Sequence, residues 1–311
     1  MSLAFVFPGQ GSQSVGMSSA LAEKYPLVKN LYSEASEVLG YDLWKLVSDG
    51  PESELNITAK TQPALLTASV AVWNIWQEHG GKLPAIMAGH SLGEYSALVC
   101  SGALAFSDAV GLVADRGAYM QTAVPEGTGT MAAILGLAED DVIKICKEYE
   151  QDQVVSAANF NSAGQIVIAG HTEAVNRVVE AASKAGAKRS VILPVSVPSH
   201  CALMKKAAEK FAERIENVSI SVPDIPIIHN VNVSQLSDPL AIKQALVDQL
   251  SHPVRWVEII ESMKTSGISG IIECGPGKVL CGLIKRIDKQ ITTWPVYDPD
   301  TLDTAMVALS H

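Results

Sequence analysis

Short, continuous hydrophobic runs alternate along the chain with longer segments in which apolar residues recur at helical spacing. The continuous runs, which are typical of buried strands, lie at residues 2–7, 83–87, 227–231, 268–273 and 291–296. The helical segments lie at residues 26–39, 42–47, 63–79, 95–100, 107–122, 201–215, 240–250, 256–265 and 279–287. This alternation indicates an α/β fold whose mostly parallel sheet is covered by helices on both faces.

The order of predicted strands and helices changes near residue 128. Strands are predicted at residues 131–135, 154–158, 165–169 and 190–195, with helices at 139–149 and 173–185. The resulting order, βαββαβ, is the ferredoxin-like pattern. We therefore predict a ferredoxin-like subdomain over residues 128–196, inserted into a core formed by residues 1–127 and 197–311. Asn159-Phe160-Asn161 is expected in the turn between the two middle strands.

Proline, glycine and serine indicate three of the expected helix ends. Pro63 suits the first turn of the helix over 63–79, and Gly80 stands just past its end. Ser107 can cap the next long helix, which runs to about residue 122.

Composition and charge narrow the classes of function. Of the 311 residues, 48% are hydrophobic and 18% are charged, which is typical of a globular protein with a sizeable core. The net charge of −10 argues against nucleic acid as a partner and gives no reason to expect attraction to a membrane. The N-terminus lacks the basic segment of a signal peptide, and no apolar run reaches the roughly 20 residues needed to cross a bilayer. We expect a cytoplasmic monomer.

The cysteines and the first glycine-rich turn give no sign of a metal or a bound cofactor. The five cysteines are odd in number and form no C-x-x-C pair, so reduced core thiols are expected. Cys201 adjoins His200, but adjacent side chains diverge, which favours a packed thiol over a nucleophile. A dinucleotide-binding turn after Gly9 and Gly11 would need a third glycine where Ser14 stands.

The segment Gly89-His90-Ser91-Leu92-Gly93 carries the clearest candidate chemistry. It follows an apolar run and precedes a helical segment, and this G-x-S-x-G context is that of a nucleophile elbow. The two glycines leave room for a sharp turn that exposes the Ser91 hydroxyl at a helix N-terminus, where amide groups can stabilise an anion. The alternative is a chance match in a structural turn, which the flanking strand and helix make less frequent.

A serine nucleophile needs a base, and His200 is the best candidate among the seven histidines. It follows a Val-Pro-Ser turn and opens a helix, whereas His90 would point away from Ser91. Because no acidic residue stands near residues 195–200, we expect a carbonyl group to orient the imidazole, giving a dyad. Arg116 lies among apolar helix neighbours, and either an anionic substrate or an internal Asp or Glu can be its partner.

Several ordered motifs together resemble one enzyme family over essentially the whole chain. They are Phe7-Pro8-Gly9-Gln10-Gly11-Ser12-Gln13, Thr61-Gln62-Pro63-Ala64, Gly89 to Tyr95, Arg116, Asn159-Phe160-Asn161, Ser196 to His200, Gln249-Leu250, Pro253 to Trp256, and Glu273 to Gly277. In this series the chain is similar to the malonyl-CoA:acyl-carrier-protein transacylases of fatty-acid synthesis. Val197-Pro198-Ser199-His200 looks like the form found in stand-alone malonyl enzymes.

The resemblance implies an α/β-hydrolase-like core with the ferredoxin-like insertion, and a role for each matched residue. Ser91 would be the nucleophile and His200 the general base and acid. The remaining implied roles are an oxyanion hole from the backbone amides of Gln10 and Leu92, a malonyl-carboxylate contact from Arg116, pocket positions for Gln62 and Asn161, and orientation of His200 by the main-chain carbonyl of Gln249.

The implied reaction is ping-pong, with no cofactor and no metal. Malonyl-CoA would acylate Ser91, and the phosphopantetheine thiol of acyl carrier protein would then take the malonyl group. Two basic clusters are candidates for docking the acidic carrier protein, or are ordinary solvated groups: Lys188 and Arg189, and Lys285, Arg286 and Lys289.

The residues alone leave two other hypotheses for the function. A serine esterase or thioesterase could use the same Ser91 and His200, and a non-catalytic carrier-protein binder could keep Ser91 as a turn residue. Arg116 and the missing acid favour transfer of a carboxylated acyl group.

Overall fold

The structure is a computed structural model that describes residues 2–195 and 197–309. Within these residues, five strands form a parallel sheet in the order β7-β2-β1-β8-β9. They are β1 (Leu3–Phe7), β2 (Ile86–Gly89), β7 (Ile227–Ile228), β8 (Gly270–Cys274) and β9 (Thr292–Val296). This sheet and the helices packed on it are called the large unit below.

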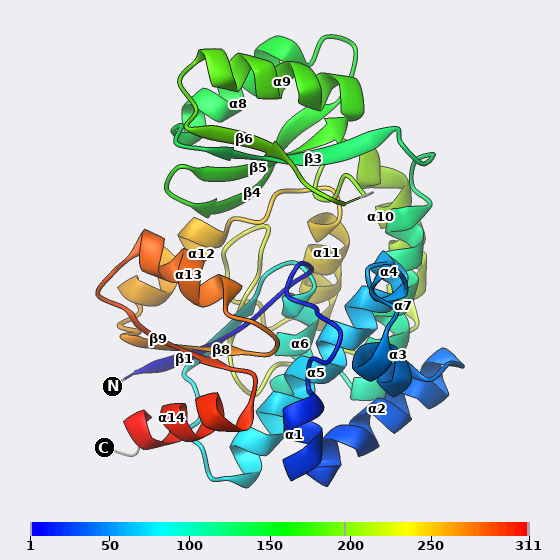
Figure 1. Cartoon of the computed structure of the whole chain (residues 1–311), viewed down its shortest axis with the longest axis vertical. Coiled ribbons are helices and arrows are strands. Elements are labelled where there is room, and N and C mark those ends of the chain that lie inside the picture. The colour runs from blue at the N-terminus through cyan, green and yellow to red at the C-terminus, as the bar shows by residue number, and fades with distance from the viewer. Residues whose placement is uncertain (1, 196, 310–311) are drawn as a thin grey trace.

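The helices of the large unit cover both faces of the sheet, as buried parallel strands require (Figure 1). They are α1 (Ser19–Lys24), α2 (Pro26–Leu39), α3 (Leu43–Asp49), α4 (Glu52–Leu55), α5 (Thr58–Glu78), α6 (Gly93–Cys100), α7 (Phe106–Gln121), α10 (Lys205–Glu216), α11 (Pro239–Gln249), α12 (Trp256–Thr265), α13 (Val279–Ile287) and α14 (Pro299–Leu309), with a 3₁₀ turn, η1, at Ala202–Met204. Because side chains alternate along β1, Phe5 and Phe7 pack with α5, whereas Ala4 and Val6 pack with α12 and α13. Of the helices in the described part of the chain, none is long and apolar enough to cross a membrane.

A second, antiparallel sheet forms the small unit, drawn in green at the top of Figure 1. Its elements are β3 (Gly129–Leu135), α8 (Glu139–Tyr149), β4 (Val155–Ser162), β5 (Gln165–His171), α9 (Thr172–Lys184) and β6 (Arg189–Ile192). The strand order is β4-β5-β3-β6, and α8 and α9 pack on one face over an aliphatic core. The other face is turned toward α12 and α13 of the large unit (Figure 1). The predicted α/β class, with a mostly parallel sheet and a separate smaller sheet, is confirmed.

The predicted start of the helix over 63–79 is wrong, because α5 begins at Thr58 and Pro63 lies inside it. A proline inside a helix typically costs about 3 kcal/mol. The extra turn is nevertheless held by tertiary packing: Gly117 of α7 lies so close to Ala59 that a side chain there would meet the α5 backbone. The Thr61 hydroxyl also donates to the Leu55 carbonyl, at 2.6 Å.

Asn159, Phe160 and Asn161 do not form the predicted turn, because they continue strand β4. Asparagine favours turns locally, but here the backbone pairs with a loop of the large unit. The Phe160 amide donates to the Val254 carbonyl, and the Val254 amide donates to the Ala158 carbonyl, each at 2.9 Å. Irregular pairing with β5 on both sides of Asn159 and Phe160 accommodates this second contact.

Other elements also differ from the predictions. The helix α7 begins at Phe106 with Ala105 at its cap position, so Ser107 lies inside it and makes no cap. Strand β7 ends at Ile228, because the next residues turn back and the Val233 amide bonds the His229 carbonyl. Helix α14 was not predicted at all.

Candidate active site

The turn around Ser91 has the geometry of a strained elbow between β2 and α6. Ser91 has a φ of 52°, in the left-handed region that residues with a side chain rarely adopt. A Cβ at Gly89 would overlap the backbone of Gly93, and a Cβ at Gly93 would overlap the Phe7 carbonyl. Both glycines are therefore required by the close approach of β1, β2 and α6, and the turn raises the Ser91 hydroxyl out of the backbone.

His200 is aligned with the Ser91 hydroxyl and with a main-chain carbonyl. Its Nε2 lies 2.8 Å from Ser91 Oγ, and its Nδ1 lies 2.7 Å from the Gln249 carbonyl oxygen. Because a carbonyl only accepts hydrogen bonds, Nδ1 must carry the proton, which leaves the Nε2 lone pair facing the hydroxyl. The dyad geometry expected from the absence of a nearby acid is present in the structure.

Burial keeps His200 neutral. The side chain is enclosed, and desolvation together with the neighbouring Arg116 guanidinium lowers the pKa of His200 to about 3. An imidazole that is neutral at physiological pH can accept the serine proton directly.

Arg116 is a buried cation that contacts amides and the Ser91 hydroxyl. Nη1 donates to Gln62 Oε1 at 2.7 Å, while Nη2 donates to Gln249 Oε1 at 2.8 Å and to Ser91 Oγ at 3.2 Å. Only 1% of its surface is exposed, and no Asp or Glu forms an ion pair with it in the described part of the chain. Within the described ranges Arg116 thus has no directly paired internal acid, and a buried guanidinium without a paired carboxylate favours an anionic ligand.

Two backbone amides beside Ser91 are free to stabilise an oxyanion. Neither the Gln10 nor the Leu92 nitrogen has a hydrogen-bond acceptor among the described residues. The Ser91 amide is unavailable, because it donates to Asn230 Oδ1 at 2.7 Å. The two amides, whose residues both line the cavity with Ser91, are therefore the candidates for an oxyanion hole.

These groups line one cavity of about 860 Å³, which is bordered by both units. Its walls include Gln10, Gln62, Ser91, Leu92, Arg116 and His200 from the large unit and Asn159 from the small one. The volume is within the range of small-molecule sites. Asn161, expected to line the pocket, is not part of its wall; its Oδ1 lies 2.8 Å from His90 Nε2 instead.

Comparisons with known proteins identify the family of the chain. The acyl transferase domain family matches residues 4–305. The chain is 56% identical over 303 residues to the malonyl CoA-acyl carrier protein transacylase of Salmonella typhimurium, covering 97% of this chain and 98% of the relative. It is 45% identical over 310 residues to the transacylase of Bacillus subtilis, covering 99% and 98%. The chain belongs to the malonyl CoA-acyl carrier protein transacylase family.

Solved structures of this family have the same fold. The malonyl CoA-acyl carrier protein transacylase of Coxiella burnetii superposes with a TM-score of 0.99 at 50% identity, covering 100% of this chain and 98% of that one. A malonyl-transacylase in complex with a type II PKS acyl-carrier protein superposes with a TM-score of 0.98 at 54% identity, covering 99% and 100%. The resemblance stated from the motifs, and with it the acyltransferase class, is confirmed.

A buried polar network beneath the transacylase elbow was missed by the sequence reasoning. It joins Glu94, His229, Asn230 and the side chain of Gln249, all of which are fully buried. Glu94 stands in the first turn of α6, where an acidic residue is usually an exposed partner of the helix dipole. His229 and Asn230 fell inside a run predicted as strand. In the sequence, the network could have been indicated only by the occurrence of several polar residues near the ends of strands that are neighbours in the sheet.

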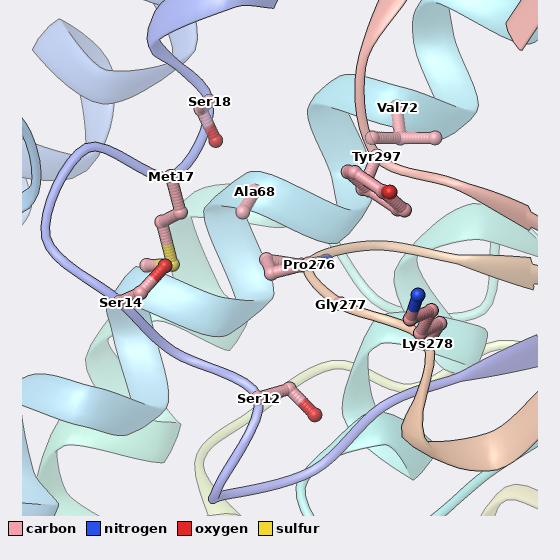
Figure 2. Close-up of a pocket in the computed structure, with 10 residues that line it drawn as sticks. All are labelled: Ser12, Ser14, Met17, Ser18, Ala68, Val72, Pro276, Gly277, Lys278 and Tyr297. Atoms are coloured by element: carbon pink, nitrogen blue, oxygen red, sulfur yellow. The ribbon is translucent and has the colours of Figure 1, made fainter. Parts of the chain in front are cut away.

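A second cavity, of about 310 Å³, lies on the other side of the loop after β1. Figure 2 shows its lining residues, which come from that loop, from α5, and from the loops after β8 and β9. Gln10, Gly11 and Gln13 border the Ser91 cavity, whereas Ser12 and Ser14 border the second one. None of the predicted site residues lines it. No cluster of His, Cys, Asp or Glu able to hold a metal ion occurs in the described ranges.

Proposed function

We propose that this chain moves malonyl from malonyl-CoA to the phosphopantetheine thiol of acyl carrier protein through an ester on Ser91, in fatty-acid biosynthesis. One observation carries the proposal: the Ser91 hydroxyl lies 2.8 Å from the basic nitrogen of His200 and 3.2 Å from the Arg116 guanidinium. Ser91 Oγ, the proposed nucleophile, therefore contacts both a base and a cation that can bind a carboxylate. Relatives at 55–56% identity are named for this transfer.

In the first half-reaction, His200 Nε2 takes the Ser91 proton as Oγ attacks the thioester carbonyl of malonyl-CoA. The amides of Gln10 and Leu92 donate to the developing oxyanion, and Arg116 binds the malonyl carboxylate in the fork geometry that suits a guanidinium. The carbon–sulfur bond then breaks, and His200 gives its proton to the departing CoA sulfur.

The second half-reaction reverses these roles. The carrier-protein thiol gives its proton to His200 Nε2 and attacks the malonyl ester. The ester bond breaks, and Ser91 Oγ regains the proton from His200, which restores the free enzyme. Gln62 and the Gln249 carbonyl hold Arg116 and His200 in place through both steps. Asn161, assigned to the pocket by resemblance, would act through its contact with His90.

We assign the architecture as an α/β-hydrolase-like core, residues 1–127 and 197–311, with a ferredoxin-like insertion over 128–196. The separate aliphatic core of the small unit and its strand–helix order support this division. The boundary residue Ser196 and the last residues of the core lie outside the described part of the chain.

We further propose that the enzyme works as a cytoplasmic monomer with no cofactor or metal, and without nucleic-acid or membrane partners. The mechanism needs only groups of this chain and its two substrates. Five free, buried cysteines are typical of a reducing compartment. The net charge of −10 disfavours polyanionic partners.

The carrier protein would dock on the exposed basic residues around α13 and β6. Lys285, Arg286 and Lys289 lie on or just after α13, and Lys188 and Arg189 lie at the start of β6. The Arg286 guanidinium donates to the Gln165 side chain on β5 of the small unit, the sheet that also carries Arg189 on β6. Charge reversal there should raise the apparent KM for acyl carrier protein and spare acylation by malonyl-CoA; equal loading at low salt would show that these groups are merely solvated.

Mass spectrometry of the intact protein after malonyl-CoA, and then of its peptides, tests the proposed function. We expect one malonyl group, on the Ser91 peptide, that is discharged by acyl carrier protein. Discharge to water without transfer would indicate a thioesterase. Absence of any acyl-enzyme would indicate a non-catalytic binder.

A further inference from the structure

Glu94 lies at the centre of the buried network beneath the elbow. Its Oε1 lies 2.7 Å from His229 Nδ1, and its Oε2 accepts from the Asn230 amide at 3.1 Å and from Gln249 Nε2 at 2.9 Å. The side chain touches neither the cavity nor the reacting atoms. Its effect on the reaction must therefore pass through the residues that it binds.

Gln249 connects this carboxylate to the site through three different groups. The side-chain oxygen accepts from Arg116 Nη2 at 2.8 Å, and the side-chain nitrogen donates to Glu94 at 2.9 Å and to the Ser91 carbonyl at 3.0 Å. The main-chain oxygen separately receives His200 Nδ1 at 2.7 Å. Gln249 thus supports Arg116 with its side-chain amide and His200 with its main-chain carbonyl. Of these two supports, only the side-chain amide is bonded to Glu94.

We propose that Glu94 is a positioning residue for malonyl selectivity, which fixes the end of the Gln249 amide that faces Arg116. A carboxylate can only accept, so Glu94, together with the Ser91 carbonyl, holds the amide NH₂ on its own side and directs the amide oxygen to the guanidinium. If the amide turned around, its NH₂ would oppose Arg116, two donors would face each other, and the guanidinium would lose its place beside Ser91. The inference depends on the proposed binding of the malonyl carboxylate by Arg116.

The two supports of Gln249 make the effect separable. The main-chain carbonyl that orients His200 is fixed at the end of α11 and does not rotate with the side chain. Loss of Glu94 should disturb Arg116 more than His200. Any disturbance of Asn230, and through it of the Ser91 amide, would slow all acyl groups alike, so the ratio between two acyl substrates isolates Arg116.

Glu94→Ala is the first test, with malonyl-CoA and acetyl-CoA as the paired substrates. The ratio of kcat/KM for malonyl to that for acetyl should fall about 10- to 100-fold, the range for losing a hydrogen bond to a charged group. The loss should lie mainly in the KM for malonyl-CoA. Glu94→Gln should restore the ratio, because its oxygen can accept from Gln249 while its NH₂ faces His229 Nδ1, which accepts when the proton moves to Nε2.

Glu273→Ala is the matched control. Glu273 is also a fully buried glutamate, near the end of β8, but it accepts from the Leu280 and Cys281 amides at the start of α13. We expect lower thermal stability and an unchanged malonyl-to-acetyl ratio. If Glu94→Ala does not fold, Glu94→Asp withdraws the carboxylate from Gln249 and is measured in its place.

A double-mutant cycle with Gln249→Leu completes the experiment, since leucine keeps the main-chain carbonyl and removes the amide. The Glu94 and Gln249 substitutions should each lower the ratio, and together they should lower it no further. Equal falls in malonyl and acetyl transfer, or additive losses, would overturn the role of Glu94. Arg116→Ala separates this failure from a failure of the proposed function, because a ratio unchanged in that variant would instead refute carboxylate binding by Arg116.

Discussion

The large unit buries ionisable and amide side chains beside its hydrophobic core, whereas the core of the small unit is almost wholly aliphatic. Arg116, Glu94, His200 and Gln249 are each at most 3% exposed. The core between α8, α9 and the small sheet consists instead of valine, isoleucine, leucine, alanine and one cysteine, together with partly buried aromatic rings. Burying polar groups is costly unless they are paired, so their concentration in one unit marks where chemistry is performed.

The difference also explains how each unit contributes to the cavity. The large unit supplies the groups with chemical reactivity, and each is held by hydrogen bonds to at least one other buried group. The small unit supplies a wall, through Asn159 and Met131, and a contact between Asn161 and His90. Substitutions in the two units should therefore separate chemistry from stability.

The largest effect is expected for Ser91→Ala, which removes the nucleophile from the large unit. Transfer should fall by about 10⁴-fold or more, as for nucleophiles of other serine enzymes, and no malonyl mass should be gained. The fold should persist, because the backbone amide of residue 91 still bonds Asn230. Stable malonylation of this variant at another residue would contradict the assignment.

His200→Ala should cost about 10²–10⁴-fold in the rate of acylation, because the serine loses its general base. Single-turnover kinetics with malonyl-CoA measure this step. His79→Ala is the control, since His79 lies at the end of α5 and bonds only its own helix, through the Ile75 carbonyl. A rate unchanged in the His200 variant would show that another group takes the proton.

The elbow and the dyad were predictable because each depends on residues close in sequence or on a simple absence. Gly89 and Gly93 flank the serine, and no acid stands near His200. The network under the elbow was not predictable in this way, because its members converge only when α6, α11 and the turn after β7 pack together. Pro63 shows the same limit for the fold: the packing of Ala59 against Gly117, which is distant in sequence, outweighed the local preference for a helix that starts at the proline.

Arg116→Ala should reduce kcat/KM for malonyl-CoA and leave acetyl-CoA unharmed. Removing one member of a desolvated charged pair typically costs about 2–5 kcal/mol, and acetyl has no carboxylate to lose. Paired assays with the two thioesters measure the split. Arg214→Ala is a suitable control, because Arg214 pairs with Asp115 at the surface. Parallel losses for both thioesters would make Arg116 a structural residue.

Val178→Ala tests the other side of the comparison. Val178 is fully buried in the aliphatic core of the small unit, and truncating it should lower the free energy of unfolding by about 2 kcal/mol. Acylation by malonyl-CoA should be unchanged at temperatures where the variant is folded. Chemical denaturation and the acylation assay, performed on the same preparation, check both parts; a loss of acylation with intact stability would show that the small unit shapes the chemistry directly.

The smallest expected effect is on the pH dependence of stability, which should change with a substitution at His200 in the large unit and not with one at Val178 in the small unit. His200 is neutral when buried, with a pKa of about 3 against an ordinary value of 6.5. As the pH falls below 6.5, the unfolded chain binds a proton there that the folded chain does not, so stability present above pH 6.5 is progressively lost toward pH 3. At pH 5.5 the expected loss from this group is about 1.4 kcal/mol. Urea unfolding of the parent and of His200→Ala at pH 7.5 and 5.5 measures it, and the variant should lose less stability between the two pH values.

Burial also lowers the pKa of His90, so the variant should keep part of the pH dependence. Val178→Ala should keep all of it, since no ionisable group is changed. An identical pH dependence in the parent and in His200→Ala would show that His200 is protonated in the folded protein at pH 5.5, and would remove the reason for treating it as a neutral base.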